Sequence, residues 1–383
     1  MSVNNIRNDR VAWLLPSMGT GGISFQHILS EFSQIFPNTI TFTGQWPGYA
    51  PSFENLFKVQ EVGATRYVEF GKAVNGYTIG FSLASPQIIR HLLQFKPQVI
   101  FANAFTAWTA IALLLKPICR WKVIITYEGG SSVYESTSST VRYQVRRFMA
   151  RLADAFVVNS KDGKSYLLDT LKVSSKKVFS KPFLVPSMEA LLHHAKPLSL
   201  KQKFQKPIFL YVGQVVPRKG LKTLLEACLL LKSQGYTNYT LLVVGDGEQR
   251  PELEKYVNDH NLIDQIEWVG RVPYGQLGSY FEQADIFVFP THDDIWGMVL
   301  VEAMAFGNAV ICSEKAGAVE LLMEGHNGFS FDPSCPKMLA ELMLKLIKDP
   351  KLVQKMGEVS QQIMSEHLPA QAISSFSEAI NSL

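Results

Sequence analysis

Short apolar runs alternate with amphipathic stretches along most of the chain, and this alternation predicts its secondary structure. The apolar runs are four to six residues long and end in glycine, proline or polar residues, as buried strands do. Strands that alternate with helices are typical of a parallel sheet with helices on both faces. In the N-terminal half, strands are predicted at residues 11–15, 39–42, 67–70, 99–102, 123–126 and 155–158.

The alternation of apolar runs and amphipathic stretches is interrupted once along the chain and then resumes. Residues 186–206 lose periodicity and collect prolines and lysines, which predicts an interdomain linker. The chain has 383 residues, more than one hydrophobic core usually serves, so two domains are expected, at 1–185 and 207–365. Residues 337–383 are mostly helical in pattern. Beyond the linker, strands are predicted at residues 208–212, 241–245, 267–272, 286–289 and 309–312.

An acidic loop follows the apolar strand at residues 286–289. After a turn at Pro290 come His292, Asp293 and Asp294, and a helix is predicted to open near Gly297. The loop therefore lies at the carboxyl end of a parallel strand and beside a helix N-terminus. Open α/β sheets bind ligands at that edge, and the N–H groups of a helix start attract phosphate.

The loop and its helix carry two acids eight residues apart, Asp294 and Glu302, with Gly297 between them. This string resembles the acid-x7-acid motif of the retaining GT-B glycosyltransferases of family 4. The resemblance implies an α/β fold of the GT-B type, with two Rossmann-like doubly wound domains facing a central cleft. It also implies that a last helix, residues 366–383, crosses back to the first domain.

Carried over by position, the resemblance gives each residue of the motif a role. Asp294 would face the transferred sugar, and Glu302 would bind the ribose of the nucleotide donor. Backbone N–H groups of Gly297, Met298 and Val299 would reach the sugar phosphate. The alternative is a helix cap at residue 293 or 294 and a solvated acid at 302, but the whole string favours the motif.

A cationic loop follows the strand at residues 208–212. Arg218 and Lys219 stand there in a pattern that resembles the family's diphosphate clamp, GxxxxRKG. Many members place an arginine directly after the first glycine, where this chain has Gln214. Arg218 and Lys219 would then hold the leaving group. The alternative is ordinary surface charge, but a position opposite the acidic loop argues against it.

Two further loops complete the donor site that the resemblance implies. Arg271 and Val272 follow a strand and are expected to contact the nucleotide base through their backbone. Gly21 and Gly22 lie in an N-terminal glycine loop that, in relatives, lines the cleft near the diphosphate. That loop lacks the third glycine of GxGxxG, which disfavours a nicotinamide cofactor.

The strand at 123–126 runs into Glu128, where relatives commonly have a histidine that reaches the transferred sugar. A glutamate can accept a hydrogen bond from a sugar or acceptor hydroxyl, but its charge beside a diphosphate calls for a cationic neighbour. Two alternatives stay open. Glu128 could act as a general base on an acceptor hydroxyl, or it could cap the following turn.

Composition and charge indicate the compartment of the protein and the kind of partner that it binds. The four cysteines are scattered without metal-ligand or disulfide spacing, and no signal peptide or spanning segment is evident, so a cytoplasmic protein is expected. Residues 1–195 carry a net charge of +9 and residues 196–383 carry −5. The basic half indicates an anionic partner such as a membrane surface, and no nucleic-acid motif accompanies it. Residues 141–152 would form a basic amphipathic helix, either membrane-bound or simply solvated.

The resemblance implies that the reaction is transfer of a hexose with retention of configuration. The donor is a nucleotide sugar, with UDP-sugars preferred over GDP-mannose, and the acceptor is a glycan or a lipid-linked acceptor of a cell-surface polysaccharide or glycolipid pathway. No cofactor and no metal are expected, because cations do the work of a metal and three adjacent loop residues seldom converge on one ion. The alternatives are a catalytically silent GT-B partner protein and a sugar-nucleotide epimerase.

Overall fold

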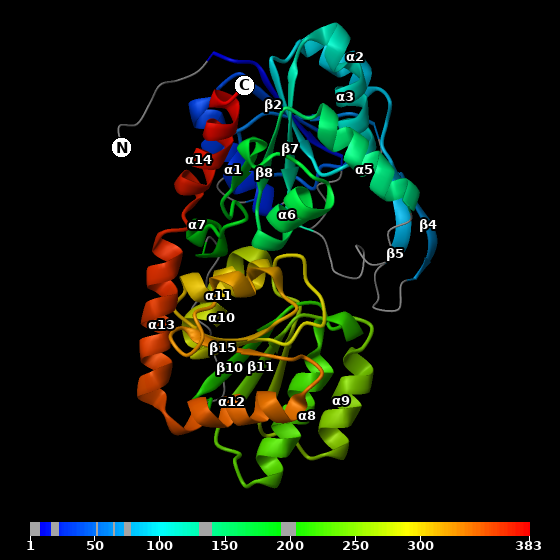
Figure 1. The fold of residues 1–383 in the computed structure, drawn as a ribbon. Helices are drawn as coiled ribbons and strands as arrows, with labels where there is room; N and C mark the ends of the chain where they lie inside the picture. Colours follow the sequence, from blue (N-terminus) through cyan, green and yellow to red (C-terminus); the bar gives the residue numbers. More distant parts are fainter. Residues whose placement is uncertain are drawn as a thin grey trace. The chain divides into compact units, whose positions relative to one another are not determined.

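The computed structural model describes residues 8–16, 23–50, 53–63, 66–72, 78–129, 140–192 and 204–383. The chain divides into two compact units (Figure 1). The first holds the described parts of residues 1–185 together with His367–Leu383, and the second holds those of Pro186–Glu366. Each unit is built on its own parallel sheet.

The sheet of the first unit has the order β3-β2-β1-β6-β7-β8-β9, and every neighbouring pair is parallel. Val11 of β1 lies opposite Thr39 on one side and Val99 on the other, so the strand order reverses between β1 and β6. The strands are β1 (Val11–Leu15), β2 (Thr39–Thr43), β3 (Val59–Glu61), β6 (Val99–Asn103), β7 (Lys122–Tyr127), β8 (Ala155–Val158) and β9 (Val178–Ser180).

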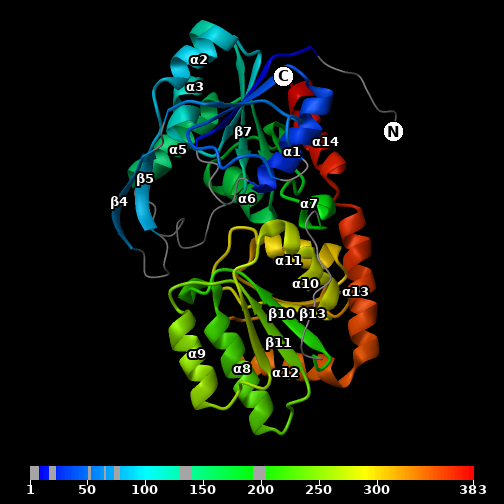
Figure 2. The ribbon, with the colours of Figure 1, turned by 180° about the vertical axis from the view of Figure 1, so that it is seen from behind.

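Helices cover both faces of this sheet (Figure 2). Trp13 stacks on Phe101 with ring centroids 4.8 Å apart, and Phe376 of the last helix packs 5.3 Å from Trp13 on the same face. The last helix thus contributes to the core of the first unit, although it follows the second unit in sequence. The helices are α1 (Ile23–Ile35), α2 (Ile88–Phe95), α3 (Ala107–Cys119), α5 (Thr140–Leu152), α6 (Lys161–Ser165) and α14 (Pro369–Asn381).

One predicted strand of the first half lies outside the parallel sheet. β4 (Arg66–Lys72) pairs antiparallel with β5 (Thr78–Leu83) in a separate two-stranded sheet. The prediction that residues 67–70 join the parallel sheet is therefore wrong. The two strands are joined by a short connection, which permits an antiparallel hairpin, whereas a parallel pair needs a long crossover.

The second unit has a six-stranded parallel sheet in the order β12-β11-β10-β13-β14-β15. Five of these strands confirm the sequence prediction. The sixth, β15, was missed because its four residues, GFSF, alternate glycine and serine with phenylalanine and form no apolar run. The strands are β10 (Ile208–Val212), β11 (Thr240–Val244), β12 (Ile266–Gly270), β13 (Ile286–Phe289), β14 (Ala309–Ser313) and β15 (Gly328–Phe331). The helices are α8 (Leu221–Ser233), α9 (Arg250–Asp259), α10 (Gly278–Gln283), α11 (Met298–Ala305), α12 (Pro336–Lys348) and α13 (Pro350–Ser365).

The predicted linker contains a short helix that its prolines concealed. α7 (Met188–Leu192) belongs to the second unit and packs against η5 (Tyr274–Gln276) and α10. Residues 193–203 of the predicted linker lie outside the described residues. From residue 204 the chain leads into β10, the central strand from which the cationic loop emerges.

Candidate active site

The cationic and acidic loops meet because their strands are neighbours. β10 and β13 pair with Phe209 opposite Ile286, so both strands end at the same edge of the sheet. The backbone N–H of His292 donates to the carbonyl oxygen of Arg218 at 2.8 Å. Gly220 has φ +70°, and a Cβ there would lie 1.9 Å from the carbonyl oxygen of Pro290. Only glycine permits this approach, so backbone contacts hold the two loops together.

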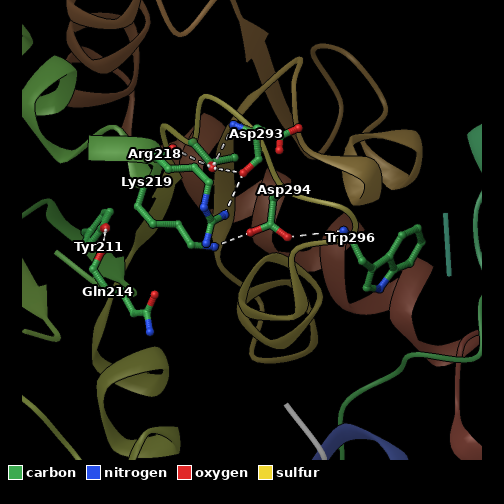
Figure 3. Close-up of polar contacts among 8 residues, drawn as sticks. Tyr211, Gln214, Arg218, Lys219, Asp293, Asp294 and Trp296 are labelled. Carbon is green, nitrogen blue, oxygen red and sulfur yellow. Dashed lines mark hydrogen bonds and ion pairs between the residues drawn. The ribbon is translucent and has the colours of Figure 1, made fainter. Parts of the chain in front are cut away.

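Charged side chains strengthen the junction (Figure 3). The Arg218 guanidinium donates from Nη1 to the carbonyl oxygen of Asp293 at 2.9 Å. Lys219 forms an ion pair with Oδ2 of Asp294, and the exposed fractions of the two side chains are 15% and 16%. The other carboxylate oxygen of Asp294 accepts a hydrogen bond from the backbone N–H of Trp296 at 3.3 Å. The cation predicted for the phosphate and the acid predicted for the sugar are therefore in direct contact.

An aromatic ring fixes the position of Lys219 and of the following helix. The Lys219 ammonium lies 5.6 Å from the centroid of the Phe289 ring, within reach of a cation–π interaction. Gly297 has φ +98°, and a Cβ at this position would lie 2.6 Å from Cε1 of the same ring. A side chain at Gly297 would therefore displace the ring that supports the lysine.

The helix α11 begins directly after Gly297, which is its N-cap. The first N–H groups of a helix have no acceptor within the helix, and they carry the positive end of its dipole. Met298 and Val299, in the first turn, are partly exposed. This end of α11 can therefore receive an anion a few residues from the Lys219–Asp294 pair.

Glu302 lies in the middle of α11 and is only 3% exposed. The alternative that it is a solvated helix residue is therefore wrong. The Tyr274 hydroxyl donates to Oε1 of Glu302 at 2.9 Å. Burial raises the pKa of the Glu302 carboxyl to about 7, and the hydrogen bond from Tyr274 acts in the opposite direction. Sequence reasoning missed Tyr274, whose only signal is an aromatic residue after Pro273.

The predicted base contacts lie along the same edge of the sheet. Arg271 is exposed and Val272 partly buried, just beyond β12, which is separated from β10 by β11. The N–H of Gly245, after β11, donates to the carbonyl oxygen of Gly270 at 2.7 Å and ties these strand ends together. Gln214 is exposed, and its backbone carbonyl oxygen accepts a hydrogen bond from the Tyr211 hydroxyl at 2.8 Å.

Glu128 lies in the first unit, directly after β7, and is partly buried. Its carboxylate accepts from the amide of Asn103 at a long 3.5 Å, and its carbonyl oxygen accepts the Ser160 hydroxyl at 3.0 Å. Burial raises the pKa of Glu128, and the Asn103 hydrogen bond partly offsets this. Among the described residues, the partner of the carboxylate is therefore a neutral amide, and the cationic neighbour that the sequence led us to expect stays a prediction. Gly21 and Gly22 lie outside the described residues.

Metal ligands and membrane-spanning helices were sought in the same part of the chain. Across the described ranges, no three His, Cys, Asp or Glu side chains converge in the way that ligands of one ion do. No helix of those ranges combines the length and the apolar character that crossing a bilayer requires.

Known families account for most of the chain. The model of group 1 glycosyl transferases matches residues 197–363, and the model of Glycosyltransferase Family 4 matches residues 43–179. The chain belongs to these glycosyltransferases. The first match covers β10 to α13, including the Lys219–Asp294 pair and Glu302, and the second covers the region of Glu128.

Individual relatives of this glycosyltransferase are distant. It is 31% identical to the uncharacterized glycosyltransferase MJ1178 of Methanocaldococcus jannaschii, over 39% of this chain and 40% of the relative. It is 30% identical to the capsular polysaccharide biosynthesis glycosyltransferase CapM of Staphylococcus aureus, over 43% and 42%. These matches thus span about two-fifths of the relatives' length.

Solved structures show that the fold extends over the whole chain. The Anabaena protein Alr3699/HepE in complex with UDP and glucose superimposes with a TM-score of 0.73 at 18% identity, over 98% of this chain and 100% of that one. With two parallel sheets and alternating helices, this glycosyltransferase has the α/β GT-B fold that its sequence predicted.

Proposed function

We propose that this glycosyltransferase transfers a hexose from a nucleotide-diphosphate sugar to a glycan or a lipid-linked glycan. The observation that carries the proposal is the contact of Lys219 with Asp294 beside the start of α11. It puts a phosphate-binding cation, a sugar-binding acid and free helix N–H groups in one place. HepE was crystallised with UDP and glucose, which supports a UDP-sugar as the donor.

Breaking the bond between the sugar and the diphosphate leaves negative charge on the phosphate oxygens. Lys219, Arg218 and the first N–H groups of α11 would stabilise that charge, and preformed cations of this kind contribute most where water is excluded. In the absence of donor, Lys219 is neutralised by Asp294. When the diphosphate binds, it replaces Asp294 at the lysine, and the released carboxylate can accept hydroxyl groups of the sugar.

The attack of the acceptor follows from the same arrangement. In the retaining reaction, the acceptor hydroxyl approaches from the side of the leaving group, and a phosphate oxygen takes its proton. No separate base is then needed. Glu128 contributes by binding a hydroxyl of the acceptor or of the sugar. The ribose of the donor would be held by Glu302, which is buried in the middle of α11.

The acceptor is proposed to be presented at a membrane, in the assembly of a cell-surface polysaccharide or glycolipid. CapM, which shares part of this sequence, is named for capsular polysaccharide biosynthesis. On α5, Val141, Val145 and Phe148 follow at helical spacing and are 72%, 50% and 54% exposed. Arg151, on the same helix, is also exposed. Apolar side chains beside a cation fit the surface of an anionic bilayer at the cytoplasmic face.

Not all arginines of α5 are available to lipid. Arg146 donates to the Tyr166 hydroxyl at 3.1 Å, and Arg147 donates to the Tyr143 hydroxyl at 3.2 Å. We therefore expect Phe148→Asp to reduce sedimentation with vesicles that contain phosphatidylglycerol, whereas Arg146→Gln has a smaller effect. Equal sedimentation of Phe148→Asp and the parent chain would contradict the membrane role.

The function is tested by incubating the protein with UDP-glucose, UDP-galactose and GDP-mannose, with and without a glycan acceptor. Release of nucleoside diphosphate and an α-linked product identify a retaining transfer. A changed sugar nucleotide formed without acceptor would identify an epimerase. If none of these donors is bound or consumed, the proposed function is wrong.

A further inference from the structure

Tyr274 contacts the candidate site from an element that the proposed reaction does not use. It begins the short helix η5, between β12 and α10, and its hydroxyl donates to Oε1 of Glu302 at 2.9 Å. The two residues are 28 positions apart, so the contact arises from the fold and not from a local motif. Within the described part of the chain, it is the one hydrogen bond that the Glu302 side chain makes.

The surroundings of Glu302 make this hydrogen bond important. The neighbouring residues of α11, Leu300, Val301, Ala303 and Met304, are all buried, and an ionised carboxyl in such a place is costly. Burial raises its pKa to about 7, so a small change in its surroundings alters its charge at neutral pH. A hydrogen bond to the ionised form favours that form.

Few other charges act on this carboxylate. β13 and β14, which pack on α11, carry no charged residue, and the acid after β13, Asp294, is paired with Lys219. Glu320 lies on η6 (Gly317–Leu321), which also contacts α11. The buried face of α13 is uncharged, and its charged residues are exposed, namely Lys351, Lys355 and Glu358.

The position of Tyr274 is itself fixed by close packing. The helix η5 contacts α7 and α10. At Gly278, the first residue of α10, a Cβ would lie 2.6 Å from Cδ2 of Leu192 and 2.8 Å from the carbonyl oxygen of Leu191. The segment that carries Tyr274 is therefore packed against α7 with no room for a side chain at Gly278.

From these observations we infer that Tyr274 is a positioning residue, which orients Glu302 and keeps it ionised so that it can bind the ribose of the nucleotide donor. This inference rests on the proposed function. A ribose diol donates hydrogen bonds, and an ionised carboxylate accepts them at both oxygens, whereas a protonated acid has lost part of that capacity. Tyr274 donates to Oε1, and we assign the ribose to the second oxygen.

The test is the pH dependence of UDP binding to Tyr274→Phe, measured by calorimetry between pH 6.5 and 9. UDP affinity should fall as the Glu302 carboxyl becomes protonated at low pH. Loss of the Tyr274 hydroxyl should raise the pH of this fall by about one unit. At pH 6.5, UDP should bind about five- to tenfold more weakly than to the parent chain, and at pH 9 within about twofold. In transfer assays at pH 7, KM for the donor should rise while kcat stays nearly constant. Tyr280→Phe, a partly buried tyrosine on α10, is the matched control and should shift nothing.

Recovery at high pH separates positioning from simple damage, because a misfolded variant does not regain affinity when the pH is raised. In a Glu302→Gln background, adding Tyr274→Phe should change UDP affinity less than about twofold, since the interaction is already lost. An unshifted pH profile for Tyr274→Phe, in a chain that binds UDP, would overturn the inference and leave the proposed function standing. Failure of the parent chain to bind UDP, GDP or ADP at any pH would instead overturn the proposed function.

Discussion

The carboxyl edges of the two sheets carry acids in contrasting surroundings. In the second unit, Asp294 has Lys219 as a partner and Glu302 has the Tyr274 hydroxyl. In the first unit, the partner of the Glu128 carboxylate among the described residues is the amide of Asn103, at 3.5 Å. Burial raises the pKa of both Glu128 and Glu302. The difference teaches that the two acids of the second unit are paired with a cation and a hydroxyl before any ligand arrives, whereas the described partner of Glu128 is a neutral amide.

The largest expected effect is the removal of the cation that balances this charge. Lys219→Ala should lower kcat/KM for transfer by about 10²- to 10³-fold, because the diphosphate loses a preformed positive partner. The exposed Lys222, three residues on, provides the control Lys222→Ala, which should stay within about twofold. Near-normal turnover of Lys219→Ala, measured by nucleoside diphosphate release, would remove this lysine from the site.

Asp294→Asn sharpens the comparison, since it separates the two roles of one carboxylate. Transfer should fall by about 10²-fold, because the sugar loses its ionised acceptor. Affinity for UDP alone should rise, because the carboxylate no longer competes with phosphate for Lys219. Calorimetry with UDP, side by side with donor turnover, measures both effects. Weaker binding of free UDP would show that Asp294 does not compete for the lysine.

Glu302→Gln should weaken donor binding and yet stabilise the fold. The pKa of Glu302 rises from an ordinary value of 4.5 to about 7, so the folded state holds more protons than the unfolded state between these values. The stability that protonation provides is complete below pH 4.5 and is lost as the pH rises toward 7. The variant should therefore gain about 2–3 kcal/mol in the free energy of unfolding at pH 8 and little at pH 4.5.

Urea denaturation at both pH values measures this gain. The matched control is Glu358→Gln on α13, an exposed glutamate whose replacement should leave both values unchanged. A loss of stability at pH 8 in Glu302→Gln would mean that the ionised carboxylate is held by more than the Tyr274 hydroxyl.

The smallest effect is expected at the edge of the first sheet. Glu128→Gln should lower transfer by no more than about tenfold, because a glutamine still accepts a hydrogen bond from a hydroxyl. A general base contributes about 10²- to 10⁴-fold, so a loss of that size would assign the base to Glu128. Initial rates at saturating donor, with the acceptor concentration varied, distinguish hydroxyl binding from general-base catalysis by Glu128.

Much of the fold and of the donor loops could be read from the sequence, because charged residues there directly follow strongly apolar strands. Asp294 and Lys219 were recognised separately in this way. Their direct contact was not predicted, since it depends on β10 and β13 being neighbours, and the two residues are 75 positions apart.

Burial of Glu302 and its contact with Tyr274 were also beyond the sequence. The helix α11 is apolar on nearly all sides, so its pattern does not show which face packs on α13 and which meets solvent. The antiparallel pairing of β4 was missed because a four-residue segment such as YVEF fits either kind of sheet.

The packing of Phe376 against Trp13 has a consequence for biogenesis. Residues 367–383 leave the ribosome after the whole second unit, yet they complete the core of the first. During translation, part of one aromatic face of the N-terminal sheet stays uncovered until these residues are made, although Phe32 of α1 can already pack on it. The second unit can fold before that point. Such a nascent chain is most prone to aggregate through its earliest-made part, which is where a chaperone would be needed.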